Sequence, residues 1–338
     1  MAKVGIVLVN IGTPKTPETK DVAIYLREFL MDPLVITLPF LFRWILVNLI
    51  IVPLRAPKSA EKYKKVWTKE GSPLAVHSEA LAKKLGAALP YPVEAAMHYG
   101  EPSLRKVLKK YEAMGLEKII VVPMYPQFAE ATTGSTKMRV KEMVKKENIT
   151  TKIEFTPPFY DDEEFLASWV RIYKDKFAQE GTPDHVLFTF HGLPQSQIKT
   201  ICESCKTDGT CCAVARTENK DCYRMQCVQT AKLLSSRLAL SEENWSVSFQ
   251  SRLGRAEWIR PYTEDVLASL AQKGKKKIAV LCPAFTADCL ETIEEIGIEG
   301  LHTFSKNGGS EYHLLPCLNS QEHWTKALAV ILQKAHGI

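Results

Sequence analysis

The stretch from Lys277 to Ile296, KIAVLCPAFTADCLETIEEI, decides how the rest of the chain is interpreted. Its first six residues, 277–282, are largely apolar and β-branched, which is typical of a strand buried on both faces of a sheet. Pro283 then ends the strand and forces a new element to begin. Open α/β sheets bind their ligands at such strand ends, so a functional site is expected at this edge.

Acidic residues follow that strand at helical spacing. Thr286 can cap a helix whose first turns carry Asp288, Glu291 and Glu295 on one face. The same residues also suit a purely structural role, because a carboxylate in the first turn of a helix gains about 0.3–1 kcal/mol from the helix dipole. The segment alone therefore leaves both interpretations open.

A histidine at a second strand end favours the functional interpretation. Residues 186–190 have the composition of another buried strand, and His191-Gly192-Leu193-Pro194 follows directly. A lone histidine is more commonly structural. An imidazole and several carboxylates at the same edge of a parallel sheet, however, form a candidate base and cation site.

Size and composition fit a globular protein of two domains. The chain has 338 residues, of which 46% are hydrophobic and 24% charged, with a formal net charge of +6. It has no basic arm or aromatic-interleaved basic cluster, so nucleic-acid binding is not expected. Six of the nine cysteines lie within 202–227, and such crowding favours a metal or cluster site in a reducing cytoplasm over a disulfide scaffold.

Strands and helices alternate in both halves of the chain, which predicts an α/β protein of the doubly wound type. We expect a first domain at 1–157, a second at 158–320 and a final helix at 321–338 that packs back on the body. The strands are expected at the following residues: 4–10, 93–99, 118–124, 152–155, 186–190, 246–251, 277–282 and 312–315.

Residues 34–54, LVITLPFLFRWILVNLIIVPL, form the most apolar segment. The length would suit a membrane-spanning helix, but Pro39, Arg43, Asn48 and Pro53 interrupt the segment, and a central charge costs roughly 2.5–3.5 kcal/mol on insertion scales. We interpret it as a hydrophobic lip that dips into a membrane face or forms a wall for an apolar substrate. A buried core helix is the structural alternative.

Several long motifs closely resemble those of the ferrochelatase family, and they follow the family's order through nearly the whole chain. They are FHGLP at 190–194, SFQSRLGRAEWIRPYT at 248–263, PAFTADCLETIEEI at 283–296, VNIGTP at 9–14, YLREFLMDPLVI at 25–36 and YPQFAEATTGS at 125–135. The resemblance implies two similar Rossmann-like domains, each a parallel sheet flanked by helices as in chelatases, with the active-site cleft between them. It implies a lyase that inserts Fe²⁺ into protoporphyrin IX, giving protohaem and releasing two protons.

The resemblance also assigns residues. His191 and Glu291 would be catalytic and would contact the iron substrate, with Asp288 beside them. His191 would act as a base, as an iron ligand, or as both. In this chain Cys289 and His98 stand where many family members have histidine and arginine. The porphyrin would be bound by Asn10, Ile11, Tyr25, Arg27, His98, Tyr99, Tyr125, Trp258 and Phe285.

The cysteine-rich insert at 202–222 resembles the internal segment that holds a 2Fe–2S cluster in some ferrochelatases. Four of Cys202, Cys205, Cys211, Cys212 and Cys222 would be the ligands. Cys227 lies in a helix that cluster-free relatives share, so it is excluded. Structural zinc is the rival interpretation.

Other functions remain open from sequence alone. A chelatase for another tetrapyrrole or metal, such as coproporphyrin or cobalt, would carry the same motifs. A non-catalytic haem carrier or an iron–sulfur redox sensor could share the same body, although it would not need the His191 and Glu291 pair. The expected location is the cytoplasm, with peripheral contact to the inner membrane, and the sequence sets no oligomeric state.

Overall fold

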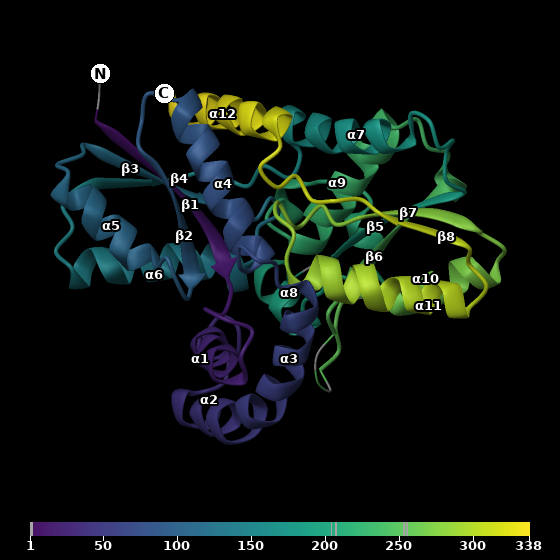
Figure 1. Ribbon diagram of the computed structural model, residues 1–338, viewed down its shortest axis with the longest axis horizontal. Helices are drawn as coiled ribbons and strands as arrows, with labels where there is room; N and C mark the ends of the chain where they lie inside the picture. The colour runs from purple at the N-terminus through teal and green to yellow at the C-terminus, as the bar shows by residue number, and fades with distance from the viewer. Residues whose placement is uncertain (1–2, 204, 207, 253, 255) are drawn as a thin grey trace. The chain divides into compact units, whose positions relative to one another are not determined.

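The computed structural model describes residues 3–203, 205–206, 208–252, 254 and 256–338 (Figure 1). The chain divides into two units. Unit 1 comprises residues 1–125, 129–157 and 320–338, and unit 2 comprises residues 126–128 and 158–319. Each unit contains a four-stranded parallel sheet flanked by helices, which confirms the predicted fold class.

The sheet of unit 1 has the strand order β2-β1-β3-β4, and every pair in it is parallel. Its strands are β1 (Val4–Gly12), β2 (Val93–Tyr99), β3 (Lys118–Pro123) and β4 (Lys152–Phe155). Because side chains alternate along a strand, β1 and β3 present apolar residues to both faces. Both strands are almost entirely buried, so the apolar runs in the sequence correspond to central strands.

Helices cover both faces of this sheet. On one face, α5 (Leu104–Ala113) and α6 (Ser135–Lys146) pack their apolar side chains against Val7 and Val121 in one continuous core. On the other face, α4 (Pro73–Ala88) contacts β1 and β2, and α12 (Glu322–His336) packs against α4. The last helix of the chain therefore belongs to unit 1.

The apolar segment that follows α1 (Thr19–Leu30) is helical and largely exposed. It comprises α2 (Phe40–Ile45), the π-helix η1 (Leu46–Ile51) and α3 (Val52–Val66), which form one helical run of 27 residues from Phe40 to Val66. Among the described residues, this run alone has the length and composition to cross a membrane, and only 22% of its most apolar window is buried. Pro53, which was expected to interrupt the segment, lies within this run and does not break it.

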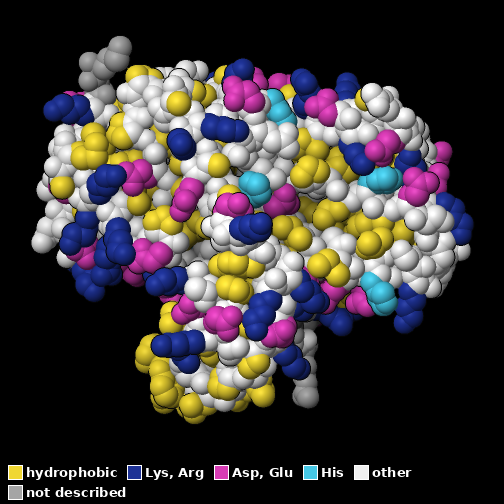
Figure 2. All heavy atoms as spheres, viewed as in Figure 1, with side chains coloured by type: hydrophobic (Ala, Val, Ile, Leu, Met, Phe, Trp, Pro, Cys, Tyr) yellow, Lys and Arg dark blue, Asp and Glu magenta, His cyan; other side chains and the backbone are white. Residues whose placement is uncertain are grey.

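The π-helix explains why Pro53 is tolerated. Proline lacks a backbone N–H and disrupts regular i→i−4 pairing, and the wider turn of η1 directly before it changes that pairing locally. Figure 2 shows hydrophobic side chains gathered over the α2 region. The exposed hydrophobic residues of the lip, residues 34–54, are Leu38, Phe40, Leu41, Phe42, Trp44, Ile45, Leu49, Ile50 and Leu54.

The sheet of unit 2 has the order β6-β5-β7-β8 and is also parallel throughout. Its strands are β5 (His185–His191), β6 (Trp245–Gln250), β7 (Lys277–Leu281) and β8 (Glu311–Leu314). The helices are α7 (Glu163–Phe177), α8 (Gln195–Ile201), α9 (Tyr223–Arg237), α10 (Thr263–Gln272) and α11 (Leu301–Lys306). Leu267 and Phe304, from α10 and α11, share a core cluster with Ile278 and Val280 of β7.

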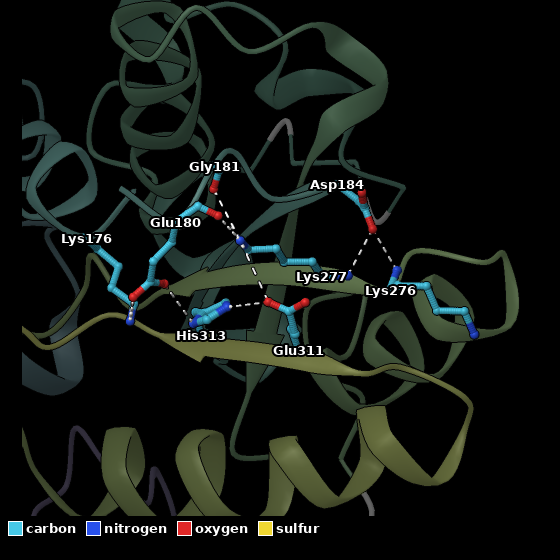
Figure 3. A network of polar contacts seen from close by, with 8 residues as sticks. All are labelled: Lys176, Glu180, Gly181, Asp184, Lys276, Lys277, Glu311 and His313. Atoms are coloured by element: carbon cyan, nitrogen blue, oxygen red, sulfur yellow. Dashed lines mark hydrogen bonds and ion pairs between the residues drawn. The ribbon is translucent and has the colours of Figure 1, made fainter. Parts of the chain in front are cut away.

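A polar network secures the N-terminal ends of β7 and β8 (Figure 3). The Asp184 carboxylate accepts hydrogen bonds from the backbone N–H groups of Lys276 and Lys277, at 2.8 and 2.9 Å. The Lys277 ammonium reaches the Gly181 carbonyl and lies 3.7 Å from the Glu311 carboxylate. These contacts lie at the opposite end of the sheet from His191, so their role is to hold the strands in register.

The helix after β7 differs from the expectation. It begins at Leu290, not after Thr286, and its first part is a π-helix, η6 (Glu291–Gly300). Residues 283–289 form turns before it, so Asp288 precedes the helix. Glu291 and Glu295 stay one turn apart, which keeps both carboxylates at the C-terminal edge of the sheet.

Candidate active site

His191 is the last residue of β5 and is held in one orientation. Its Nδ1 lies 2.6 Å from the Gly192 carbonyl oxygen, and its own carbonyl accepts a hydrogen bond of 2.7 Å from the Tyr223 hydroxyl. A carbonyl can only accept, so Nδ1 carries the proton and Nε2 keeps its lone pair. The ring has two aromatic neighbours, and its centroid is 6.3 Å from that of Trp258 and 6.4 Å from that of Phe285.

Glu295 is fixed beside His191 by a serine that sequence reasoning did not select. The Ser251 N–H and hydroxyl donate to the two oxygens of Glu295, at 2.7 and 2.6 Å. Ser251 adopts φ 69°, a left-handed conformation that is uncommon for a residue other than glycine. The only signal in the sequence is its place in the SFQSR motif next to Gln250.

Burial shifts the acid–base properties of Glu295. Burial, the largest effect, raises the pKa of this carboxyl, and the nearby charge of Glu291 raises it further. Hydrogen bonding to Ser251 and the charge of His191 lower it. These influences place His191, Glu291 and Glu295 within electrostatic reach of one another. The structure therefore brings together an imidazole and two carboxylates in unit 2.

Asp288 has a different set of partners. Its carboxylate accepts hydrogen bonds from the Asn319 side-chain amide at 2.7 Å and from the Thr292 hydroxyl at 3.1 Å. The Cys317 N–H also points to both of its oxygens, at 3.3 Å each. These contacts join the segment after β8 to the start of η6, so Asp288 fixes the position of the helix that carries Glu291.

The remaining residues predicted to bind porphyrin lie in unit 1. Asn10 turns its side-chain oxygen to the N–H of Ile11, at 3.0 Å. Arg27 donates from Nε to the Asn48 side chain of the lip, at 2.8 Å. Tyr25 is buried and packs between Phe29 and Tyr63, with ring centroids 6.2 and 6.5 Å away.

His98 and Tyr99 belong to a buried polar network centred on Asp32. The Tyr99 hydroxyl donates to Asp32 Oδ2 at 2.8 Å, and the Ser135 hydroxyl donates to the same oxygen at 2.5 Å. His98 Nε2 lies 2.8 Å from the Ser135 hydroxyl and 3.8 Å from Asp32. The Leu34 N–H donates to the other Asp32 oxygen, at 2.8 Å, which ties the start of the lip to the sheet.

Burial and hydrogen bonding shift the pKa values of Asp32 and His98 in this network. Burial would raise the pKa of Asp32, but the hydrogen bonds from His98, Ser135, Leu34 and Tyr99 outweigh it and lower the pKa to about 2. Burial also lowers the pKa of His98, which favours the neutral imidazole. The Tyr125 hydroxyl is likewise buried, and among the described residues it has no hydrogen-bond partner.

The cysteines of the insert lie near one another, but they do not surround a common point. The Sγ atoms of Cys211 and Cys212 are 3.9 Å apart. A hydrogen bond from Cys212 lowers the pKa of Cys222 to about 6, whereas burial and the neighbouring Cys211 and Cys222 raise the pKa of Cys205 to about 12. Within the described ranges, no three His, Cys, Asp or Glu side chains are arranged to hold one metal ion.

The sequence profile of the ferrochelatase family matches residues 3–336. The chain belongs to the ferrochelatase family. It is 47% identical to the ferrochelatase of Bdellovibrio bacteriovorus over 335 residues, covering 98% of this chain and 99% of that one. It is 43% identical to a ferrochelatase of Pseudomonas fluorescens biotype C over 334 residues, with 98% and 97% coverage. The resemblance drawn from the sequence motifs is thus confirmed.

Solved chelatase structures share the fold. SirB from Bacillus subtilis with Fe³⁺ has a TM-score of 0.58 at 13% identity, covering 99% of this chain and 96% of that one. The cobalt complex of the sirohydrochlorin chelatase SirB from Bacillus subtilis subspecies spizizenii has a TM-score of 0.55 at 14% identity, with the same coverage. At such low identity these likenesses support the two-sheet architecture alone. Family membership makes the chain an enzyme of haem biosynthesis that inserts metal into a porphyrin.

Proposed function

We propose that the chain is a lyase that inserts Fe²⁺ into protoporphyrin IX, giving protohaem and two protons. The observation that carries this proposal is the grouping of the His191 imidazole, whose Nδ1 faces the Gly192 carbonyl, with the Glu291 and Glu295 carboxylates within electrostatic reach of one another. Metal insertion requires a base and a cation site whose oxygen ligands bind the metal weakly. Family membership supplies the reaction class.

The chemistry divides between these groups. Two pyrrole N–H protons must leave the macrocycle while the iron enters, and His191 Nε2 is the atom to which we assign their acceptance. Glu291 and Glu295 pass the incoming Fe²⁺ toward the imidazole, or carry protons away from it, because they lie one turn apart. Trp258 and Phe285 flank the imidazole, and they hold the porphyrin so that its nitrogen lone pairs are exposed. In unit 1, we assign porphyrin contacts to Asn10, Ile11, Tyr25, Arg27, His98, Tyr99 and Tyr125.

Replacing Glu291 with glutamine should lower the rate of Fe²⁺ insertion by about 10²-fold, since the variant keeps the shape of the side chain but loses its charge and basicity. The measurement is the initial rate of metalation of protoporphyrin IX under anaerobic conditions. Glu299→Gln is the matched control, because Glu299 lies in the same π-helix and is exposed. Equal rates for both variants would remove Glu291 from the mechanism.

The porphyrin preference needs its own comparison. Protoporphyrin IX and coproporphyrin should be metalated side by side by the unmodified protein. The exposed apolar lip favours the less polar protoporphyrin. A higher kcat/KM for coproporphyrin would identify coproporphyrin as the preferred substrate.

We also propose that four of Cys202, Cys205, Cys211, Cys212 and Cys222 hold a 2Fe–2S cluster. The donor chemistry fits, because thiolates are the usual ligands of such clusters and five thiols lie within 21 residues of sequence. The lowered pKa of Cys222 supplies one thiolate near neutral pH. The sulfurs would have to move together to bind a cluster, since the described residues do not present a converged ligand set. The cluster would supply one-electron redox chemistry.

Anaerobically purified protein should therefore be coloured and contain about two irons and two inorganic sulfides per chain. Replacing Cys222 with serine should remove the visible absorption, whereas Cys282→Ser, in the core of unit 2, should retain it. One zinc ion per chain and no visible absorption would establish the rival zinc site instead.

We further propose that the protein is cytoplasmic and contacts a membrane surface through the lip. Phe40, Leu41 and Phe42 are 62–66% exposed, and contiguous apolar surface of this kind is expensive in water. Phe40→Ser combined with Phe42→Ser should reduce sedimentation with phosphatidylglycerol vesicles by more than tenfold. Met114→Ser is the control, because Met114 is an exposed hydrophobic residue in another part of unit 1. Vesicle binding that both proteins share equally would refute a role for the lip.

A further inference from the structure

Arg224 connects the cysteine-rich insert with a stretch of backbone that lies near His191. It is the second residue of α9, and its side chain is buried. Nη2 of its guanidinium donates to the Arg260 carbonyl at 2.9 Å, and Nη1 donates to the Lys206 carbonyl at 3.5 Å. One side chain therefore holds two stretches of backbone that are far apart in the sequence.

The insert is packed closely around this guanidinium. Gly209 adopts φ 83°, and a side-chain carbon at this position would collide with the Arg224 guanidinium, so glycine is required both by conformation and by space. The Lys206 N–H donates to Cys211 Sγ at 3.2 Å. The backbone of Lys206 thus contacts a candidate cluster ligand through its N–H and Arg224 through its carbonyl.

The second contact of Arg224 leads to the neighbourhood of His191. Two backbone hydrogen bonds, of 2.9 and 3.0 Å, pair residues 257–259 with residues 193–195, just after the strand that ends at His191. Trp258 lies in the middle of this paired segment, and its ring centroid is 6.3 Å from that of His191. The Arg260 carbonyl directly follows the segment, so its position affects how firmly the aromatic neighbour of the imidazole is held.

We propose that Arg224 is a positioning residue that couples the cysteine site, meaning the candidate ligands of the insert, to the surroundings of His191. The inference rests on the 2Fe–2S cluster proposed above. Lys206 lies in the backbone between two of the candidate ligands, so a filled cysteine site fixes its carbonyl and, with it, the guanidinium. Arg224 then holds the Arg260 carbonyl, and residues 257–259 stay paired more firmly than in the metal-free protein.

The positional role can be separated from the charge of the side chain. A cluster with four thiolate ligands carries a net negative charge, and a buried cation beside it favours the reduced form. Arg224→Gln should therefore make the midpoint potential of the cluster more negative. Arg224→Lys should leave the potential close to that of the unmodified protein, because the charge is kept. A lysine ammonium lacks the planar fork that reaches two carbonyls at once, so both variants should lose the coupling.

The test compares amide hydrogen exchange in residues 257–260 with and without iron at the cysteine site. Full-length protein is purified anaerobically, and one portion is depleted of iron with a chelator under reducing conditions. Depletion should accelerate exchange of these amides about tenfold in the unmodified protein, because a hydrogen bond from a charged group is no longer held in place. In Arg224→Lys, the loaded and depleted forms should exchange at the same fast rate.

Arg237→Gln is the matched control, since Arg237 lies in the last turn of the same helix and donates to the Leu233 carbonyl and to Glu163 instead. It should respond to depletion as the unmodified protein does. Iron content and circular dichroism verify that each variant is loaded and folded.

Two results would overturn the coupling. Equal exchange in the loaded and depleted unmodified protein would show that the cysteine site and residues 257–260 are independent. A normal response to depletion in Arg224→Lys would show that the coupling runs through other contacts. If the unmodified protein holds no metal at its cysteines, the proposed cluster fails and the coupling fails with it, whereas the rate of iron insertion, measured separately, still decides the role of His191.

Discussion

Replacing His191 with alanine is expected to lower the rate of iron insertion by about 10²–10⁴-fold, the usual contribution of a positioned general base. The imidazole has the tautomer that a base requires, because Nδ1 donates to the Gly192 carbonyl at 2.6 Å and Nε2 is left as the acceptor. Its neighbours Trp258 and Phe285 would remain to bind the ring. The loss should therefore appear in kcat, with the Kd for metal-free porphyrin changed less than about threefold.

The matched control is His302→Ala, since His302 is an exposed histidine on α11 of the same unit. Rates are followed anaerobically by the decay of porphyrin fluorescence, and circular dichroism verifies the fold of each variant. A His191→Ala enzyme that retained more than a third of the unmodified rate would exclude this imidazole as base and as obligatory iron ligand.

Replacing Asp32 with alanine is expected to destabilise unit 1 by about 3 kcal/mol. The substitution removes the acceptor of Tyr99, Ser135 and the Leu34 N–H, and each buried donor left without a partner costs roughly 1–3 kcal/mol, partly recovered by water and relaxation. Amide hydrogen exchange in β1 and β2 should accelerate by about 100-fold, and the start of the lip should lose protection as well. Glu70→Ala, at an exposed residue of unit 1, is the control.

The same carboxylate gives a pH dependence with a defined sign. Its pKa falls from 3.8 to about 2 on folding, so the ionised form is favoured by the folded state. The stabilisation is fully present above about pH 4 and is lost as the pH falls through the folded pKa near 2. The Asp32→Asn variant lacks this ionisation, so its stability should change less than that of the unmodified protein between about pH 4 and about pH 2.5. Parallel losses in both proteins would assign the acid sensitivity to other groups.

The fold could be predicted from sequence because its strands are buried on both faces. The runs 186–190 and 277–282 are apolar without alternation, and the structure places both in the centre of a parallel sheet. Helix α7 begins directly after Asp162, whose carboxylate caps it by accepting from the Glu164 N–H, and aspartate is among the usual capping residues. Local composition and capping chemistry determine these features, so they can be read from the residues involved.

Other parts of the site depend on contacts that local sequence does not encode. Ser251 and Glu295 are 44 residues apart, and their pairing follows from the way β6 and η6 reach the same sheet edge. The sequence predicts Asp288 beside His191, but its hydrogen bonds go to the Asn319 side chain and the Cys317 N–H. The π-helix is not predictable in the same way, because its i→i+5 pairing has no distinct sequence signal and acidic spacing suits an α-helix equally well.

The two sheets repeat one plan, and this repetition extends to an unusual detail. In each unit the third strand in the order, β3 or β7, leads into a π-helix, η2 (Glu130–Gly134) or η6. The position after this strand is nevertheless used differently in the two sheets. η6 carries the carboxylates next to His191, whereas Ser135, which directly follows η2, donates to the buried Asp32. The same backbone arrangement thus presents, in one sheet, the groups to which we assign proton and metal transfer and, in the other, a structural anchor.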